Sequence, residues 1–381
     1  MPNTHHTVWV VSPSKLCNLR CSYCYEWGEL GNPARMAPSA LHQLLVNVRD
    51  YHRELADRNP RVTTNISWLG GEPMLLPLDY LEEIMRMEHE IFGDLLATGR
   101  IYNVVQSNLY KLDDAHLDFI ARHVWKLGIS LDVMPGVRRS LNGRATEARV
   151  MENVARVRAR GIQPDPIAVL AGHTVGHLRE VYDFFAANGF TRLRILPLFS
   201  GPPDRPLAGV LATNDAMADA LCDLFLHWLR TGSRLTLDPI ADYLASVTRK
   251  ILDLPSPMYD RTRDGEAVLV INTNGDAYQV IDAYEPDLAM GNVATTPIAE
   301  IMTSEATLRS RRRDAERVGA MCGPCSYAGY CSGAPAFESP REGTDEGRCQ
   351  IHHRVHRFIE RYLRDAGLDA PALRRLLEVR A

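Results

Sequence analysis

The stretch that decides the fold is Thr7–Tyr25, TVWVVSPSKLCNLRCSYCY. It begins with β-branched and aromatic residues, which predict a strand at residues 7–11. The loop after that strand holds three cysteines, Cys17, Cys21 and Cys24, in a C-x3-C-x2-C pattern. A chemistry-bearing loop directly after a strand is typical of α/β folds, in which ligands gather at the carboxyl ends of the strands.

Strand and helix patterns alternate along residues 7–196. The predicted strands are Thr7–Val11, Ile66–Leu69, Tyr102–Gln106, Gly128–Leu131, Ile167–Leu170 and Arg192–Leu196, and the predicted helices are Pro38–Asp57, Leu78–Leu96, Ala115–His123, Thr146–Arg160 and Val175–Asn188. This alternation predicts right-handed βαβ units and a parallel sheet. Because these strands are too few for a closed eight-stranded barrel, we expect an α/β fold with a partial (β/α)6 TIM-like barrel.

The composition changes after Phe199, where half of SGPPDRPLAG is proline or glycine and predicts a loop. A helical pattern follows over residues 214–252, and two apolar runs around NTNG in Ala267–Ile281 predict a hairpin. The expected domains are a barrel at 1–212, a helical linker at 213–262, a cysteine-rich auxiliary domain at 263–350 and a helical segment at 351–381.

The composition excludes several classes of protein. Lys and Arg total 43 against 47 Asp and Glu, a net charge of −4, so the bulk electrostatics favour neither nucleic acid nor a membrane as a partner. With 45% hydrophobic and 24% charged residues, the chain is typical of globular proteins. We expect a cytoplasmic protein with reduced thiols, because the sequence shows neither a signal peptide nor a run of about 18 apolar residues.

In a reducing compartment, eight cysteines indicate metal binding or catalysis rather than disulfides. Cys222 lies in DALCDLFLHWL among apolar residues at helical spacing, so we assign it to packing. Thiolates from Cys17, Cys21 and Cys24 can bind three irons of a [4Fe–4S] cube and leave the fourth iron open. The alternative is zinc, although a closed zinc site needs a fourth ligand that the neighbouring sequence does not supply.

The loop resembles the radical S-adenosylmethionine (SAM) superfamily, in which C-x3-C-x2-C has an aromatic residue, here Tyr23, before the last cysteine. Companion motifs of that family follow in order at predicted strand ends: Gly70-Gly71-Glu72-Pro73, Gln106-Ser107-Asn108, Ile129-Ser130-Leu131-Asp132 and Leu196-Pro197-Leu198. Leu109 replaces the glycine of the family's Q-T-N-G. The ordered matches identify the chain as similar to this family over most of its length.

The resemblance implies that SAM binds at these strand ends. Backbone carbonyl groups of Gly70-Gly71 and the carboxylate of Glu72 would hold its methionine amino group, and Leu198 would contact adenine through its backbone. Ser130 and Arg138 would contact the ribose and the carboxylate. Further implied cofactor contacts are Tyr23, Ser107, Asn108 and Asp132. An electron from the cluster would cleave SAM to methionine and a 5′-deoxyadenosyl radical, which abstracts a substrate hydrogen.

A second group of cysteines resembles the SPASM domain of relatives that mature peptides and sulfatases, and the predicted hairpin before it agrees. Two departures stand out, because Val280 or Ile281 and Pro335 occupy positions where that domain usually has cysteine. We therefore expect no inner cluster and one auxiliary [4Fe–4S] cluster. A four-cysteine zinc knuckle is the alternative. The expected ligands are Cys322, Cys325, Cys331 and Cys349.

The favoured function is an oxidative modification of a peptide or protein side chain, by cross-linking or dehydrogenation. Asp282 is the expected catalytic base, with a solvated hairpin aspartate as the alternative and with Asp132 and Tyr284 as other candidates for substrate contact. Two other functions stay open: a dehydrogenase or epimerase of an aminocyclitol or sugar, and a non-catalytic iron–sulfur scaffold. Expected partners are a flavodoxin- or ferredoxin-type electron donor and, because the first strand begins near Thr7, a separate leader-peptide recognition protein unless the barrel mouth serves.

Overall fold

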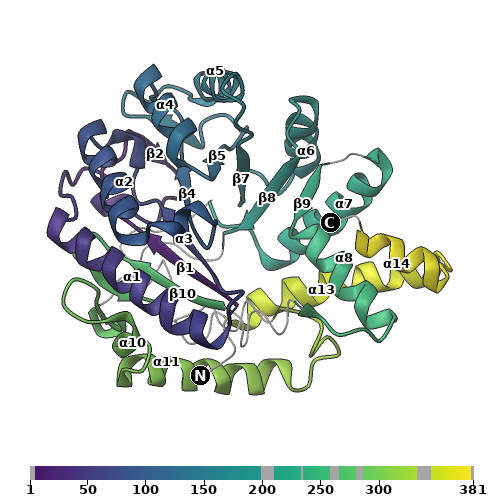
Figure 1. Ribbon diagram of the computed structural model, residues 1–381. Coiled ribbons are helices and arrows are strands. Elements are labelled where there is room, and N and C mark those ends of the chain that lie inside the picture. The colour runs from purple at the N-terminus through teal and green to yellow at the C-terminus, as the bar shows by residue number, and fades with distance from the viewer. Residues whose placement is uncertain are drawn as a thin grey trace. The chain divides into compact units, whose positions relative to one another are not determined.

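The computed structural model describes residues 5–198, 210–232, 235–257, 266–279, 286–332 and 345–378 (Figure 1). These residues form two compact units. The first unit consists of Met1–Ser130, Arg138–Pro164 and Asp264–Arg313, and the second of Leu131–Val137, Asp165–Arg263 and Asp314–Ala381.

The first unit is built on a sheet in the strand order β12-β11-β10-β1-β3-β4-β5. Its parallel strands are β10 (Glu266–Ile271), β1 (His6–Val11), β3 (Thr63–Trp68), β4 (Ile101–Ser107) and β5 (Lys126–Ser130). The short strands β11 (Asp276–Tyr278) and β12 (Gly291–Asn292) are antiparallel to their neighbours. Because the parallel strands share one direction, the loops after β1, β3, β4 and β5 leave the same edge of the sheet.

Helices complete the first unit: α1 (Pro38–Arg58), α2 (Leu78–Phe92), α3 (Asp94–Ala97), α4 (Asp114–His123), α5 (Glu147–Arg158), α10 (Ile298–Ile301) and the first part of α11 (Glu305–Cys322). The core lies between helices and sheet, where Trp9, Leu44 and Ile66 are at most 1% exposed. The prediction of one continuous helix at Leu78–Leu96 is wrong. It breaks at Gly93, whose φ of +50° places it in the left-handed region that glycine adopts without strain.

The second unit contains the parallel strands β7 (Asp165–Leu170), β8 (Arg192–Pro197) and β9 (Thr236–Asp238). Its helices are α6 (Leu178–Ala187), α7 (Asn214–Thr231), α8 (Ile240–Ile251), α13 (Asp345–Asp365) and α14 (Ala370–Glu378). Helix α13 packs against both α7 and α8. The apolar stripes of these helices meet in a core that includes Phe225, Val247 and Ile359, and all three side chains are fully buried.

The expectation of a helical pattern across residues 214–252 is corrected by strand β9. Helix α7 begins at a cap in which the Thr213 side chain accepts a hydrogen bond from the Ala216 amide, and Gly232, with φ +55°, follows its last residue. Leu237 is then fully buried in β9, opposite Leu193 of β8. A strand this short has no periodicity that could distinguish it from the apolar stripes of the helices on either side.

The predicted hairpin is confirmed. Strands β10 and β11 are joined through NTNG, and the Gly275 amide donates a hydrogen bond of 2.8 Å to the Asn272 carbonyl. Gly275 has φ +90°, which explains the glycine of the Asn-Gly pair. Strand β10 also pairs with β1 over its whole length, so the hairpin is part of the parallel sheet of the first unit.

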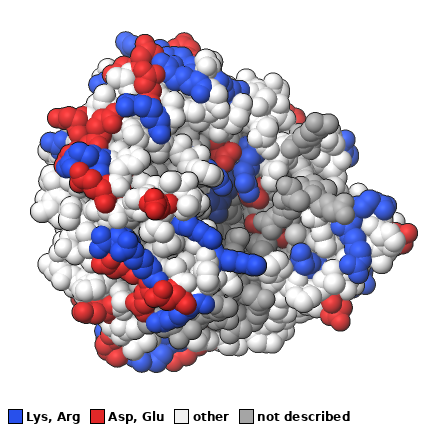
Figure 2. Space-filling model, viewed as in Figure 1, with Lys and Arg blue, Asp and Glu red and all other residues white. Residues whose placement is uncertain are grey.

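Charged side chains of both signs are interspersed over the face seen in Figure 2. Exposed ion pairs also form within single helices, such as Arg86 with Glu83 and Glu90 on α2. Among helices of the described residues, none combines the length and the apolar character needed to cross a bilayer.

Candidate active site

The cysteine loop follows β1 and contains a short strand, β2 (Leu19–Cys21), which pairs antiparallel with β6 (Arg138–Ser140). In this register Cys21 lies opposite Arg138. The Arg138 guanidinium donates a hydrogen bond of 2.8 Å to the hydroxyl of Tyr23, and Arg138 is only 6% exposed. The pairing therefore brings two residues that the sequence assigned to SAM, Tyr23 and Arg138, to the cysteine loop.

The thiols of the loop lie in a largely buried environment. Burial raises the pKa of Cys17 to about 11, with the charge of Glu72 as the next cause, and burial followed by the charge of Cys21 raises the pKa of Cys24 to about 12. The Leu19 amide donates to the Cys17 sulfur at 3.4 Å, and the Asn108 side-chain amide approaches the same sulfur at 3.8 Å. Amide donors aimed at sulfur stabilise a thiolate, which is the form that binds metal.

Gly70 and Gly71 allow the loop after β3 to lie directly against the cysteine loop. A Cβ atom on Gly70, whose φ is +122°, would lie 2.3 Å from the Ser14 carbonyl oxygen, and one on Gly71 would lie 2.2 Å from the Lys15 carbonyl oxygen. Backbone hydrogen bonds join the two segments, including one of 3.0 Å from the Gly71 amide to Ser14. No side chain fits at either position, so both glycines are required for this contact.

The carboxylate of Glu72 is buried, with 4% exposure, at the ends of β3 and β4. It accepts hydrogen bonds from the Ser107 hydroxyl at 2.7 Å, the Asn108 amide at 2.6 Å and the Met74 amide at 3.0 Å. These donors are neutral, and burial raises the pKa of Glu72 above its ordinary value. A cationic group beside this carboxylate would offset the energetic cost of burying its negative charge. The site is therefore suited to hold an ammonium group.

Leu109 keeps the backbone conformation that a glycine would adopt at its position. Its φ is +49°, in the left-handed region that costs an ordinary residue roughly 1–2 kcal/mol. Its side chain is 1% exposed, and its carbonyl accepts a 2.7 Å hydrogen bond from the buried side chain of Asn153. Burial and the Asn153 contact hold the strained residue, so the departure from glycine leaves the turn intact. Sequence reasoning missed Asn153, because nothing in α5 marks it.

The other predicted SAM contacts are divided between the two units. In the first, Ser130 at the end of β5 accepts a 2.8 Å hydrogen bond from the Gln106 side chain. In the second, buried Asp132 accepts a 2.8 Å bond from the Val169 amide, and the Leu198 amide donates to the Leu170 carbonyl at 2.9 Å. Asp132 therefore has a backbone partner in β7.

A buried ion pair flanks the cysteine loop and was missed by the sequence analysis. Lys15 and Glu26 are 5% and 4% exposed, and the Lys15 ammonium donates to the Glu26 carboxylate. Burial lowers the pKa of Lys15, and the charge of Glu26 opposes that effect. Opposite charges just before Cys17 and just after Cys24 were the signal that could have revealed this pair.

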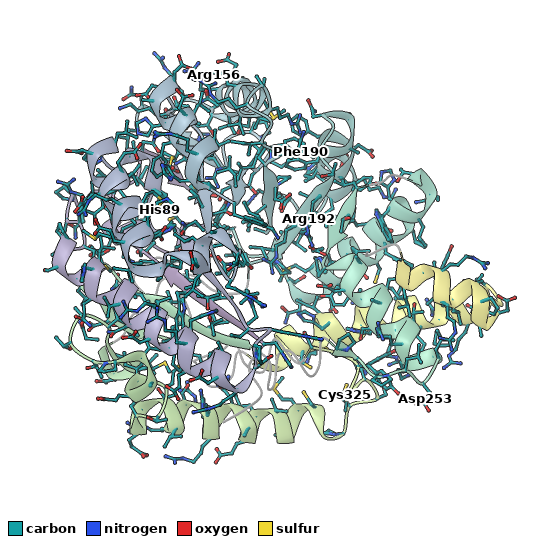
Figure 3. The ribbon with its side chains drawn as sticks, in the orientation of Figure 1. His89, Arg156, Phe190, Arg192, Asp253 and Cys325 are labelled. Carbon is teal, nitrogen blue, oxygen red and sulfur yellow. The ribbon has the colours of Figure 1, made fainter. Side chains whose placement is uncertain are left out.

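The C-terminal cysteines lie in the second unit. Figure 3 labels Cys325, in the turn after α11, and its amide donates to the Cys322 carbonyl at 3.0 Å. Burial raises the pKa of Cys349 on α13 to about 11, and the charges of Cys322 and Cys325 contribute to that rise. The Cys331 amide donates to the Tyr327 carbonyl at 3.0 Å. In the parts of the chain that the structure describes, no three His, Cys, Asp or Glu side chains are grouped around one metal-ion position.

Several residues named in the sequence analysis lie outside the described residues. Asp282 and Tyr284, the predicted base and a predicted substrate contact, are among them. Val280, Ile281 and Pro335, the departures from the SPASM pattern, are also outside. Their roles stay predictions from sequence.

Residues 11–185 match the family model of the radical SAM superfamily. This part of the chain is a radical SAM domain. The match begins in β1 and includes the cysteine loop, Gly70-Gly71-Glu72, Ser107 and Ser130.

Curated relatives of the radical SAM domain include enzymes that mature sulfatases. The chain is 22% identical over 350 residues to a serine-type anaerobic sulfatase-maturating enzyme of Bacteroides thetaiotaomicron, and the match covers 86% of this chain and 81% of that enzyme. It is 23% identical over 184 residues to a cysteine-type anaerobic sulfatase-maturating enzyme of Clostridium perfringens, covering 47% and 48% of the two chains.

Solved structures show the same fold. Native anSMEcpe with bound AdoMet and Cp18Cys peptide has a TM-score of 0.74 at 17% identity, covering 95% of this chain and 98% of that one. Streptococcus suis SuiB bound to S-adenosylmethionine has a TM-score of 0.59 at 12% identity, covering 90% and 75%. The α/β class and the partial-barrel expectation are confirmed by these similarities.

The residues of the radical SAM domain fit its cofactors, SAM and a [4Fe–4S] cluster. Cys17, Cys21 and Cys24 supply thiols on one loop, which suits a cluster with one open iron. Glu72 supplies a buried carboxylate whose hydrogen-bond partners among the described residues are neutral, which suits the cationic methionine end of SAM. The role of Cys322, Cys325, Cys331 and Cys349 as ligands of an auxiliary cluster stays a prediction from the sequence.

Proposed function

We propose that this protein is a radical SAM enzyme that removes a hydrogen atom from a side chain of a peptide or protein and oxidises that side chain by two electrons in all. The observation that carries the SAM chemistry is Glu72, held at 2.7 Å from the Ser107 hydroxyl beside the cysteine loop. Similarity to one sulfatase-maturating enzyme along 86% of the chain supports the substrate class. The first substrates to test are therefore peptides with a central serine or cysteine, and dehydrogenation is the expected change.

Two groups of cysteines would hold the two clusters. Cys17, Cys21 and Cys24 would hold the radical SAM cluster, and the four C-terminal cysteines would hold one auxiliary cluster. When bound, SAM with its reduced cluster supplies a hydrogen-abstracting radical, and the auxiliary cluster supplies a one-electron acceptor.

Side chains around these cofactors would position SAM and exclude water. Glu72 would bind the methionine ammonium group, while Ser107 and the Asn108 amide keep its carboxylate oriented. Arg138, oriented by Tyr23, would bind the SAM carboxylate or ribose. Gly70 and Gly71 keep the loop after β3 against the cysteine loop, so SAM and the cluster would be held close together before the reaction.

The oxidation of the substrate also releases a proton, so it requires a base. Oxidation by two electrons would remove one hydrogen atom, and then one electron and one proton, from the substrate side chain. Asp282 is the proposed proton acceptor, because a carboxylate with a suitable pKa can serve as a general base. An electron donor of the flavodoxin or ferredoxin type would reduce the radical SAM cluster, and a separate protein for leader-peptide recognition stays part of the proposal.

The test is product formation by anaerobically reconstituted protein with SAM, a chemical reductant and peptides that contain serine or cysteine. We expect 5′-deoxyadenosine and a peptide lighter by two hydrogens, measured by mass spectrometry. Glu72→Gln should lose SAM binding and both products, whereas Glu88→Gln, which alters another buried glutamate of the first unit, should keep SAM binding. Wild-type 5′-deoxyadenosine formation with Glu72→Gln would contradict the proposed site. An oxidised aminocyclitol or sugar, with no change in any peptide, would contradict the substrate class.

A further inference from the structure

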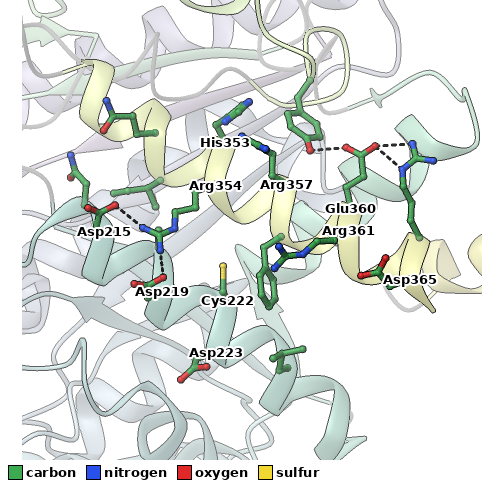
Figure 4. Close-up of a pocket in the computed structure, with 18 residues that line it drawn as sticks. Asp215, Asp219, Cys222, Asp223, His353, Arg354, Arg357, Glu360, Arg361 and Asp365 are labelled. Atoms are coloured by element: carbon green, nitrogen blue, oxygen red, sulfur yellow. Dashed lines mark hydrogen bonds and ion pairs between the residues drawn. The ribbon is translucent and has the colours of Figure 1, made fainter. Parts of the chain in front are cut away.

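Two helices of the second unit, α7 and α13, are joined by exposed charges (Figure 4). Arg354 on α13 donates a hydrogen bond of 2.6 Å to Asp215 on α7 and also donates to Asp219. Water can replace a partner that is lost from such an exposed pair, so contacts of this kind contribute little. The first unit contains a contact of a different kind, in which a buried side chain holds a strained segment of backbone.

The buried side chain is that of Asn153 on α5, which is 0% exposed. Its nitrogen donates a hydrogen bond of 2.7 Å to the Leu109 carbonyl and lies 3.5 Å from the Tyr110 carbonyl. Arg156, one turn further along α5, donates to the Asn153 side-chain oxygen at 2.9 Å. Because the oxygen of this amide faces Arg156, its NH₂ group faces the turn that follows β4.

The same turn holds the carboxylate of Glu72. The Leu109 amide donates to the Ser107 hydroxyl oxygen at 3.0 Å, and that hydroxyl donates to one Glu72 oxygen at 2.7 Å. The Asn108 amide donates to the other Glu72 oxygen at 2.6 Å. Since the Ser107 oxygen accepts the Leu109 amide, its own proton is directed at Glu72. The two donors to Glu72 therefore depend on the backbone conformation at Leu109.

Leu109 has a φ of +49°, which is unfavourable for any residue with a side chain. Asn153 holds the peptide group that follows Leu109, whereas the donors to Glu72 come from residues that precede it. Rotation about φ to relieve the strain would turn the Leu109 amide away from Ser107. The bond from Asn153 opposes this rotation, because a buried carbonyl that loses its donor is costly.

We propose that Asn153 is a positioning residue for SAM, which holds Leu109 in its left-handed conformation and thereby keeps Ser107 and Asn108 on the carboxylate of Glu72. The proposal rests on the proposed function, in which Glu72 binds the methionine ammonium group. Without the Asn153 bond, a larger fraction of the free protein would have a relaxed turn that does not orient Glu72. The apparent affinity for SAM falls in proportion to the fraction that is competent to bind.

This role makes the effect of Asn153 depend on the residue at position 109. Glycine adopts a left-handed φ without strain, so a turn with glycine there would not need the bond from Asn153. The Asn153→Ala change should therefore matter with leucine at this position and not with glycine. A purely structural role for Asn153 predicts no such dependence, because loss of its bond would then act through the stability of the unit alone.

The test is calorimetric titration of SAM into full-length, cluster-loaded protein, anaerobically and without reductant, with thermal melting of the same samples. Asn153→Ala should weaken SAM binding about tenfold, because strain of the size expected at Leu109 would lower the competent fraction by about that factor. In the Leu109→Gly background the same change should alter the affinity by less than about twofold. The double variant should bind SAM more tightly than Asn153→Ala although it melts at a lower temperature, since it also lacks a buried leucine side chain. Affinity and stability would then change in opposite directions.

The matched control is Asn47→Ala, which removes a bond of the same kind from the same unit. Asn47 on α1 is 6% exposed, and its side chain donates to the Val293 carbonyl at 2.8 Å. This variant should lose stability and keep its SAM affinity within about twofold of the wild type. Asn153→Asp, which keeps the size of the side chain and an acceptor for Arg156, should weaken SAM binding as Asn153→Ala does, because it lacks the NH₂ donor.

Unchanged SAM affinity in Asn153→Ala would overturn the positioning role, and so would a double variant that binds SAM no better than Asn153→Ala. Equal weakening by Asn47→Ala would also overturn it, since the effect would then follow from general loss of stability. A wild-type protein that binds no SAM, or Glu72→Gln that binds it normally, would instead contradict the proposed function. A failed positioning role and a failed function therefore give different results.

Discussion

The hydroxyl of Ser107 donates a 2.7 Å hydrogen bond to the buried carboxylate of Glu72. This bond joins the loop after β3 to the last residue of β4, so two motifs that are distant in sequence act as one structural unit. Buried polar groups depend on all their partners, because water cannot replace a lost one. The orientation of Glu72 toward SAM should therefore depend on Ser107.

Ser107→Ala should weaken SAM binding and destabilise the first unit by about 1–3 kcal/mol, because one oxygen of Glu72 loses its hydroxyl donor in a buried site. Calorimetric SAM titration and thermal melting measure the two effects. Ser67→Ala, on the partly exposed β3 position, is the matched control and should change neither. Unaltered SAM affinity in Ser107→Ala would show that Glu72 does not need this bond.

Anaerobically reconstituted protein should contain about eight iron atoms and about eight sulfides, corresponding to two cubes. Replacing Cys17, Cys21 and Cys24 with alanine should remove half of the iron and all cleavage of SAM. Replacing Cys322 and Cys325 should remove the other half and reduce product more than uncoupled SAM cleavage. Half the expected iron together with bound zinc in the wild type would assign the C-terminal site to zinc.

Glu88 should make stability fall as pH rises. Burial raises its folded-state pKa to about 8 from an ordinary value of 4.5, although Asn103 donates a hydrogen bond to it. The folded protein therefore holds this proton more tightly than the unfolded chain, and unfolding releases it between these pH values. The stabilising contribution is complete below about pH 4.5 and is lost as pH rises through about 8, at roughly 1.4 kcal/mol per unit of difference in pKa.

Denaturant unfolding of Glu88→Gln tests this dependence. Measurements at roughly pH 5 to 9 cover most of the range in which Glu88 loses its proton. The variant should lose much less stability across the range than the wild type does. Glu90→Gln, at an exposed position on the same helix, should behave like the wild type. Glu72 contributes with the same sign in all three proteins, so only the difference between them is diagnostic.

Lys15 and Glu26 should show strong coupling in a double-mutant cycle. Lys15→Met alone leaves a buried carboxylate without its ammonium partner and should cost about 3–5 kcal/mol of unfolding free energy. Glu26→Gln alone should also destabilise, whereas the double variant should cost much less than the sum of the two. Chemical unfolding of the cluster-free wild type, the two single variants and the double variant measures the four free energies of the cycle. Additive losses would show that the pair is not a unit.

Asp282→Asn should keep the iron content and still transfer deuterium from labelled substrate into 5′-deoxyadenosine, while it loses most of the product. The reason is that an amide cannot accept the proton that leaves as the substrate radical is oxidised. Isotope analysis by mass spectrometry and iron assays measure these quantities. Wild-type turnover in this variant would remove Asp282 from the mechanism.

Local patterns in the sequence were sufficient for much of the fold and of the candidate site. Strand β1 and the cysteine loop were predictable because apolar alternation and cysteine spacing act over a few residues. Gly70 and Gly71 were also predictable, and the structure shows that a Cβ atom at either would lie within 2.3 Å of the cysteine-loop backbone. The NTNG turn was predictable because a left-handed turn strongly favours glycine.

Only the tertiary structure decided features that depend on residues far apart in the chain. Nothing local indicates that Leu109 keeps a left-handed φ, because its buried side chain and the Asn153 contact supply the stabilisation. The Lys15–Glu26 pair is likewise visible only once the segments on either side of the cysteine loop are packed together. Sequence spacing specifies which groups one short segment presents, whereas partner choice for buried and charged groups depends on packing between segments, which no local pattern contains.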